Sequence, residues 1–212
     1  SSRDGEAQLN AYLDDHAYLI DAILELPQAH WESRYLDFAI RLAERLLEHF
    51  EDPVHGGFFF TSDDHETLLH RPRPLADDAT PSGNGVAIEA LRGLSQLCGD
   101  LKFQDAATRA LRAAWPAVDG APYAHVGLLE ALQHHLEPAE HWVVRGSDAD
   151  LHAWRQAACA RHIPGRALYA IPIDADGLPD SLAAKVGRGD GVNAYRCRGT
   201  GCEPPTDRLD EL

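Results

Sequence analysis

Hydrophobic residues in the first 50 positions recur every three or four residues, which is the spacing of one face of an amphipathic helix. A first helix is predicted over residues 9–24 and is expected to end at Pro27. A second is predicted over residues 35–50, with Ser33 as a candidate N-cap. Two helices in direct succession predict an antiparallel hairpin.

The same period returns after residue 85. Helices are predicted over residues 86–98, 103–115 and about 123–136, with a tight corner at Gly99 and Asp100 between the first two. Repeated helical hairpins with long loops at one end are typical of an α/α toroid. Five helices are too few to close such a ring, so we expect a partial toroid.

The pattern changes after Pro138. Short strands are predicted over residues 141–144, 167–171 and 192–196, and they alternate with helices over residues 148–159 and 180–186. This alternation predicts a small parallel α/β unit. We therefore expect a mostly α chain with two domains, which are a helical-hairpin domain over residues 1–138, part of an α/α barrel, and a small C-terminal α/β unit over residues 139–212.

The net charge of the chain limits the kinds of molecule that it is expected to bind. The formal net charge of −15 disfavours nucleic acid and anionic membrane surfaces, because both would be repelled. No run of about 18 apolar residues predicts a membrane span, and the polar first residues show no signal-peptide pattern, so a cytoplasmic location is expected. The chain begins with Ser1 and not with Met, which suggests a piece of a longer protein.

Four cysteines stand at positions 98, 159, 197 and 202, and without a dense framework we expect reduced thiols. The spacing of Cys197 and Cys202 leaves two interpretations open, a disulfide or two free thiols on a terminal turn. The pair offers only two of the four ligands that a structural zinc site requires. No metal and no cofactor are therefore predicted.

The segment between the second and third predicted helices is long and polar. Its residues 77–85 have the composition of a loop that feeds a helix N-terminus, where Thr80 or Ser82 can act as the cap. Arg71 and Arg73 precede it in a run of alternating arginine and proline that resists both helix and sheet. Carboxylates, hydroxyls and an amide gathered here suit a small polar ligand such as a sugar. A purely structural loop is the alternative.

Several motifs resemble one known family. They are Asn10-Ala11-Tyr12-Leu13-Asp14-Asp15, Gly56-Gly57-Phe58-Phe59, Arg71-Pro72-Arg73, Asp77 with Ala79-Thr80-Pro81-Ser82-Gly83-Asn84, and Tyr195-Arg196-Cys197 followed by Cys202. Together they resemble the DUF255 family, which includes the YyaL and spermatogenesis-associated protein 20 groups. The likeness runs from Arg3-Asp4-Gly5 to Cys202-Glu203-Pro204-Pro205. The chain departs from the family pattern at His16, Asp78 and Gly85.

The resemblance implies a C-terminal fragment of a thioredoxin-domain-containing protein. Family members join a thioredoxin-like domain to an α/α barrel that is similar to N-acylglucosamine 2-epimerase and the six-hairpin glycosidases. That domain and the first half of the barrel would lie upstream of Ser1 as the partners of this chain. The likeness of the barrel to those enzymes implies carbohydrate metabolism.

Epimerisation or isomerisation next to a carbonyl needs a base that takes a carbon-bound proton. His16, His55 and His65 are the candidates for that base. His16 also falls on the buried face of the first predicted helix, where a core histidine is the alternative.

Glycoside cleavage instead needs two carboxylates on opposite sides of one bond, and Asp15 and Asp77 are the pair to test. Asp15 lies at the edge of a buried helix face, where an acid is costly unless it is paired. An ion pair from Asp15 to Arg71 or Arg73 that ties the first helix to the long loop is the structural alternative.

Two hypotheses follow. In the first, the protein is a carbohydrate-active enzyme, epimerase-like or isomerase-like before glycosidase-like, and the isolated fragment is inactive. Its predicted catalytic residues are Asp15, His16 and Asp77, and its predicted substrate-binding residues are Tyr12, Arg71, Arg73, Ser82 and Asn84. In the second, the chain is a non-catalytic binding or interaction module for the thioredoxin-like domain. An incomplete ring exposes apolar helix faces, so we also expect the fragment to self-associate.

Overall fold

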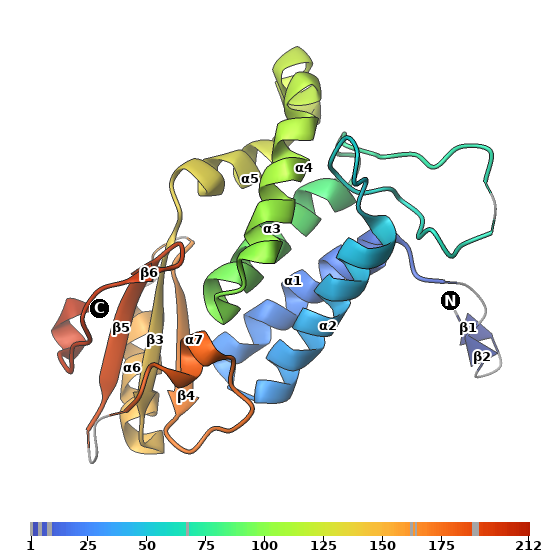
Figure 1. The fold of residues 1–212 in the computed structure, drawn as a ribbon. Coiled ribbons are helices and arrows are strands. Elements are labelled where there is room, and N and C mark those ends of the chain that lie inside the picture. Colours follow the sequence, from blue (N-terminus) through green and yellow to red (C-terminus); the bar gives the residue numbers. More distant parts are fainter. Residues whose placement is uncertain are drawn as a thin grey trace.

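The computed structural model describes residues 10–66, 68–161, 163, 165–187 and 191–212, and the backbone of the short strands β1 (Ser2–Arg3) and β2 (Glu6–Ala7). Leu9 of the first predicted helix, and Asp4 and Gly5 of the family-like motif, lie outside the described residues. Over the described part the chain is mostly helical, with a small sheet toward its C-terminal end (Figure 1). The predicted fold class is confirmed.

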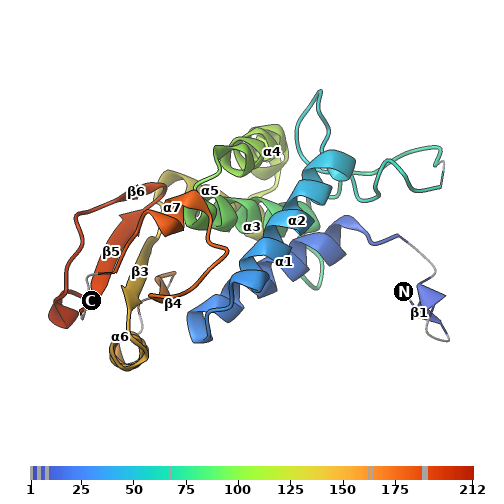
Figure 2. The same cartoon turned by 60° about the horizontal axis from the view of Figure 1, so that its bottom comes forward.

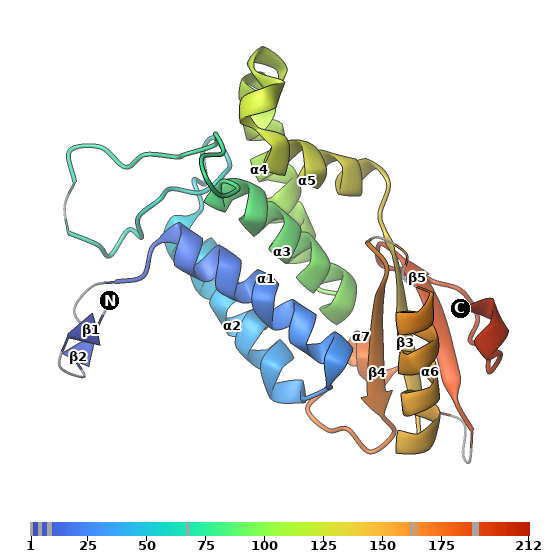
Figure 3. The same ribbon diagram turned by 180° about the vertical axis from the view of Figure 1, so that it is seen from behind.

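Two helical hairpins and a further helix form the larger part of the molecule. α1 (Leu13–Ala29) and α2 (Ser33–Phe50) make the first hairpin, and α3 (Gly83–Cys98) and α4 (Leu101–Gly120) make the second. α5 (Val126–Leu136) follows the short 3-10 helix η1 (Pro122–Ala124). Since α3 contacts α1, α4 and α5, the helices α1, α3 and α5 lie side by side in one layer, with α2 and α4 behind them (Figure 3).

Two helices are longer than predicted and continue through a proline. α1 runs through Pro27 to Ala29, and α4 runs through Pro116 to Gly120. A proline removes one N–H donor and so one intrahelical bond, but here few helical residues follow it, so little of either helix must continue beyond the interruption. Pro27 and Val118 are buried, so packing of these last turns outweighs the missing bonds.

The sheet has the order β4-β3-β5-β6. β3 (Glu140–Gly146) and β4 (Ala167–Pro172) are parallel and are connected through α6 (Asp148–Ala160), as predicted. β5 (Asn193–Arg198) runs antiparallel to β3, so the expectation of an all-parallel unit was wrong. The reason is α7 (Asp180–Ala183), which is too short to carry the chain back along the sheet, so the chain enters β5 from the opposite end.

The last strand, β6 (Gly201–Cys202), pairs with β5 as a hairpin that places Cys197 opposite Cys202. The two cysteines form a disulfide, so reduced thiols were the wrong expectation for this pair. Cys98 and Cys159 are free thiols.

The sheet separates two cores. On one face Val143, Tyr169 and Ile171 join the core of the helical hairpins, and on the other face Trp142 and Val144 pack against α6. Figure 2 shows α6 on one side of the sheet and the helical hairpins on the other. The domain boundary near Pro138 stays a prediction. None of the helices in the described part of the chain has the length and apolar content needed to span a bilayer.

Candidate functional site

Asn84, a predicted ligand-binding residue, is fully buried at the start of α3. Its Oδ1 accepts a hydrogen bond of 2.8 Å from the Phe58 N–H, and its Nδ2 donates bonds of 2.9 Å to the carbonyls of Phe58 and Pro74. The side chain thus pairs with Phe58 as a neighbouring strand would. These three internal bonds hold the long loop against α3.

Asp77 and Ser82 act at helix N-termini. The Asp77 carboxylate accepts bonds of 2.8 Å from the N–H groups of Ser82 and Gly127, which stand at the beginnings of α3 and α5. A carboxylate is favoured there by the partial positive charge of the helix ends. Ser82 is the N-cap of α3, and its hydroxyl accepts a bond of 3.2 Å from the Gly85 N–H.

Arg71 and Arg73 contact residues within the long segment between α2 and α3 and at the end of α2. Arg71 donates to the carbonyls of His49 and Thr61 and lies over the Phe59 ring, 4.2 Å from its centroid. Arg73 donates to the Gly56 carbonyl at 2.6 Å and pairs with the buried carboxylate of Asp52 at 3.0 Å.

The predicted residues of α1 also make local contacts. The Asp15 carboxylate accepts a bond of 2.8 Å from the Tyr12 N–H, and no ion pair joins it to an arginine among the described residues, so the Asp15–arginine bridge was wrong. The Tyr12 ring stacks on Phe60 at 4.8 Å. His16 Nδ1 lies 3.1 Å from the Tyr12 carbonyl, and its ring packs on Phe50. The proposed roles of all eight site residues stay predictions, but their side chains are engaged within the protein and do not line the cleft described next.

That cleft lies between α1, α3, α5 and the first two strands of the sheet. It consists of two hollows of about 200 and 230 Å³ that share Asp21 and Glu89, and we call it the acidic cleft because five carboxylates and one arginine line it. The carboxylates are Asp21, Glu25, Glu89, Glu130 and Glu140, and the arginine is Arg92. Pro81 and Gly85 line the second hollow, so the loop of residues 77–85 reaches the edge of the cleft.

Glu89 is the centre of the polar contacts in this cleft. Its Oε2 lies 2.8 Å from Arg92 Nη2 on the next turn of α3 and 2.9 Å from His134 Nδ1 on α5. The other ring nitrogen of His134, Nε2, makes no hydrogen bond to any described residue. A carboxylate that holds one imidazole nitrogen leaves the other to exchange protons with a ligand.

Asp21 stands at the exposed rim between the two hollows. Burial of its inner side, together with repulsion from Glu25, Glu89 and Glu130, raises the pKa of this carboxyl above its usual range. A carboxyl with a raised pKa in a cleft is a candidate proton donor.

The inner end of the first hollow is formed by Arg92, His141 and Tyr169, which we call the closed end. All three are less than a tenth exposed. Burial, reinforced by the charges of Lys185 and Arg92, lowers the pKa of His141 to about 4. Burial also raises the pKa of the Tyr169 hydroxyl. Both side chains are therefore uncharged at neutral pH.

Sequence reasoning missed these residues because their partners come from different helices. The spacing of residues does not reveal the role of His134, because its partner Glu89 lies 45 residues away in the chain, on α3. A signal was present, since Glu89 and Arg92 interrupt an apolar helix that is buried almost all round. Isolated charges at such positions usually have a partner or a function.

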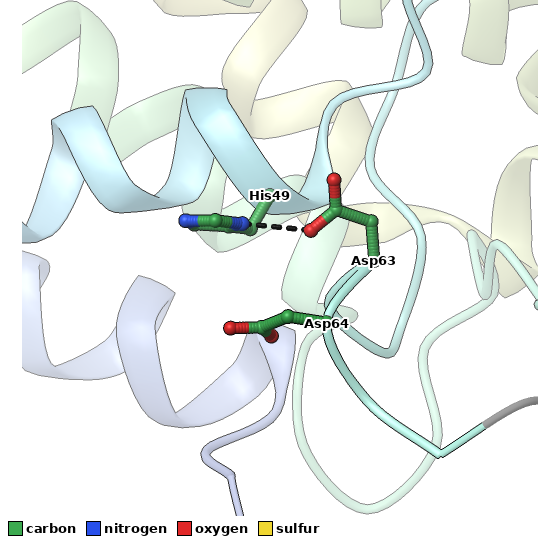
Figure 4. Close-up of side chains that lie close together, drawn as sticks. All are labelled: His49, Asp63 and Asp64. Carbon is green, nitrogen blue, oxygen red and sulfur yellow. Dashed lines mark hydrogen bonds and ion pairs between the residues drawn. The ribbon is translucent and has the colours of Figure 1, made fainter.

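A second cluster of ligand-type side chains lies at the end of α2, where His49 faces Asp63 and Asp64 (Figure 4). His49 Nδ1 lies 2.7 Å from Asp63 Oδ1, and Asp64 accepts from Asn10 at 3.2 Å and lies 3.7 Å from Arg45. Because protein groups already occupy these atoms, we assign the cluster to packing of the loop and not to a metal.

Comparison with known proteins identifies relatives. The chain is 30% identical to spermatogenesis-associated protein 20 of Rattus norvegicus over 82% of its length, and 28% identical to that of Homo sapiens over 95%. It is 22% identical to "Uncharacterized protein B0495.5" of Caenorhabditis elegans over 98% of its length. No protein-family model matches it. The chain covers 22%, 26% and 29% of these relatives in turn, roughly a quarter of their length. The chain belongs to the family of spermatogenesis-associated protein 20.

Proposed function

We propose that the protein is a carbohydrate-active enzyme of the epimerase or isomerase type and that its site is the acidic cleft. The observation that carries this proposal is the contact of 2.9 Å between Glu89 and His134 on the wall of a polar hollow. Here the base is His134 and not His16, whose ring packs on Phe50.

The chemistry begins with removal of a proton from the carbon next to a sugar carbonyl. Glu89 accepts the Nδ1–H of His134, so Nε2 carries the lone pair that receives the proton. Asp21, with its raised pKa, supplies a proton to the opposite side of the substrate. The remaining carboxylates of the cleft accept hydrogen bonds from sugar hydroxyls.

The rest of the cleft would be supplied by other parts of a longer chain. The thioredoxin-like domain and the first barrel helices implied by the family resemblance remain proposals, as do a sugar ligand and a cytoplasmic location. Under this proposal residues 1–212 alone provide one wall and are inactive.

The test is exchange of a carbon-bound proton in the full-length protein. We expect deuterium from D2O to appear next to the carbonyl of an unphosphorylated aldose or ketose, measured by proton NMR. His134→Gln abolishes this exchange, because glutamine cannot accept the proton. His135→Gln is the matched control, since adjacent helix positions point about 100° apart. No exchange with any such sugar, or exchange by His134→Gln at the wild-type rate, contradicts the proposal.

A second candidate is a non-catalytic module that binds the thioredoxin-like domain. It is favoured by the internal hydrogen bonds of Asp77, Ser82 and Asn84, which give the predicted loop a structural role. In that case the thioredoxin-like domain, produced separately, co-elutes with residues 1–212 in size-exclusion chromatography, and Glu89→Gln leaves the complex intact. Sugar-dependent exchange in the full-length protein would exclude it.

A further inference from the structure

The closed end of the acidic cleft contains polar groups whose hydrogen-bonding capacity is unused. Arg92 donates hydrogen bonds to Glu89 through Nη2 and Nε, while its Nη1 is enclosed without an acceptor. His141 Nδ1 is likewise enclosed without a partner. Tyr169 meets His141 edge to face, with ring centroids 6.4 Å apart, and its hydroxyl makes no hydrogen bond to any described residue.

Buried polar groups in proteins nearly always have partners. Here two enclosed atoms without one, Arg92 Nη1 and His141 Nδ1, come from α3 and β3, and both residues line a hollow of about 200 Å³ that Tyr169 of β4 also lines. Such convergence of donors from separate elements indicates that a ligand atom completes them.

The chemistry of the three groups indicates what that atom is. Arginine can only donate hydrogen bonds, and a neutral imidazole and a phenol can each donate one, so the ligand atom is an acceptor. The charge of Arg92 is balanced by Glu89 at 2.8 Å, and His141 is uncharged at neutral pH. The closed end therefore offers donors without net charge.

The surroundings disfavour an anion. Asp21 and Glu25 stand on the same hollow, and the second hollow adds Glu130. A phosphate would share the cleft with these carboxylates, and like charges repel.

We propose that Arg92, His141 and Tyr169 bind the carbonyl oxygen of an uncharged, unphosphorylated substrate. This deepens and rests on the proposed function. Arg92 Nη2 and His134 Nδ1 lie 2.8 and 2.9 Å from the same Glu89 oxygen, so the guanidinium that binds the carbonyl oxygen and the imidazole that acts as the base are neighbours in one cleft.

The experiment uses three small probes that differ in one feature each. Dihydroxyacetone carries an uncharged carbonyl, glycerol lacks it, and dihydroxyacetone phosphate adds a phosphate. In the full-length protein with 15N-labelled histidine, dihydroxyacetone is expected to shift the His141 ring signals in a saturable way. Glycerol and the phosphate leave them unchanged at the same concentration.

Two variants test the contacts. Arg92→Lys keeps the pair with Glu89 but loses Nη1, and Tyr169→Phe loses only the hydroxyl; each is expected to weaken dihydroxyacetone binding about tenfold. Arg109→Lys is the matched control, because Arg109 also donates through Nε and Nη2 to a glutamate, Glu51, which lies outside the cleft. If Arg92→Lys does not fold, the binding of dihydroxyacetone to Tyr169→Phe alone tests the proposal.

The subsite is wrong if dihydroxyacetone does not shift His141, if glycerol or the phosphate binds equally well, or if Tyr169→Phe binds like the wild type. These failures are distinct from failure of the proposed function. If dihydroxyacetone binds at His141 but no sugar exchanges a proton, the subsite proposal stands and the proposed enzymatic function is wrong. If a sugar exchanges a proton but His141 does not respond, the proposed function stands and the subsite proposal is wrong.

Discussion

Among single residues, Asn84 shows how one buried amide can organise a long loop. It bonds both backbone groups of Phe58 and the carbonyl of Pro74 from a position without solvent exposure. Both donors of this amide and one of its two acceptor sites are used within the protein, and its loss leaves three backbone groups without these partners.

We expect Asn84→Ala to lower the free energy of unfolding by about 3 kcal/mol, measured by urea denaturation. Asn10→Ala is the control, because Asn10 is exposed and its loss should change stability by less than about 0.5 kcal/mol. Wild-type stability together with lost activity in Asn84→Ala would restore Asn84 as a ligand-binding residue.

His141 makes stability depend on pH. The unfolded chain binds a proton at this residue below about pH 6.5, whereas burial delays protonation of the folded chain to about pH 4. The unfolded state thus holds more protons between these values, so stability falls as the pH is lowered through that window.

The expected loss from this residue between pH 7 and pH 4 is about 3 kcal/mol. It is measured as the difference in unfolding free energy between wild type and His141→Gln at each pH, since other groups titrate alike in both. Parallel stability curves would show that His141 is not kept neutral by the fold.

At the scale of elements, the corner between α3 and α4 depends on Gly99. This residue has φ of +77°, and a Cβ placed on it would lie 2.7 Å from the Cβ of Ser181 on α7. Ser181 also donates to the Cys98 carbonyl at 2.7 Å, so the corner joins both hairpin helices to the α/β unit.

Gly99→Ala is expected to destabilise the protein by about 2 kcal/mol, from left-handed strain and the clash together. Gly120→Ala, at the end of α4, is the matched control, because its added Cβ meets no atom within 4 Å. Thermal denaturation followed by circular dichroism compares the two. Equal melting temperatures would mean that the corner relaxes without cost.

The helices were predictable because burial imposes a period of 3.6 residues, which is visible in α1 to α5. The ends of α1 and α4 were not predictable, because tertiary packing lets each helix continue through a proline, Pro27 in α1 and Pro116 in α4. The direction of β5 depends on how the segment with α7 connects it to β4, and nothing within residues 193–198 specifies that direction. The roles of Asp77 and Asn84 depend on partners 50 and 26 residues away. The loop position was thus predictable, but the contacts of its side chains were not.

For the whole molecule, the outer face of α1 remains apolar where it meets solvent. Leu19 and Leu26, seven positions apart and so on one side of the helix, are 43% and 49% exposed. Exposed apolar stripes favour association.

We therefore expect residues 1–212 alone to self-associate in light scattering as the concentration rises. Leu26→Lys shifts the equilibrium toward monomer, while Leu101→Lys, at an exposed position on α4, does not. A monodisperse monomer of the unaltered chain at all concentrations would refute this.

The position of Asp77 has a consequence for motion. One carboxylate accepts hydrogen bonds from the first turns of both α3 and α5 through its two oxygens, so movement of this side chain releases both helix ends at once. For that reason we expect the amides of Ser82 and Gly127, although far apart in the chain, to exchange with deuterium at similar rates.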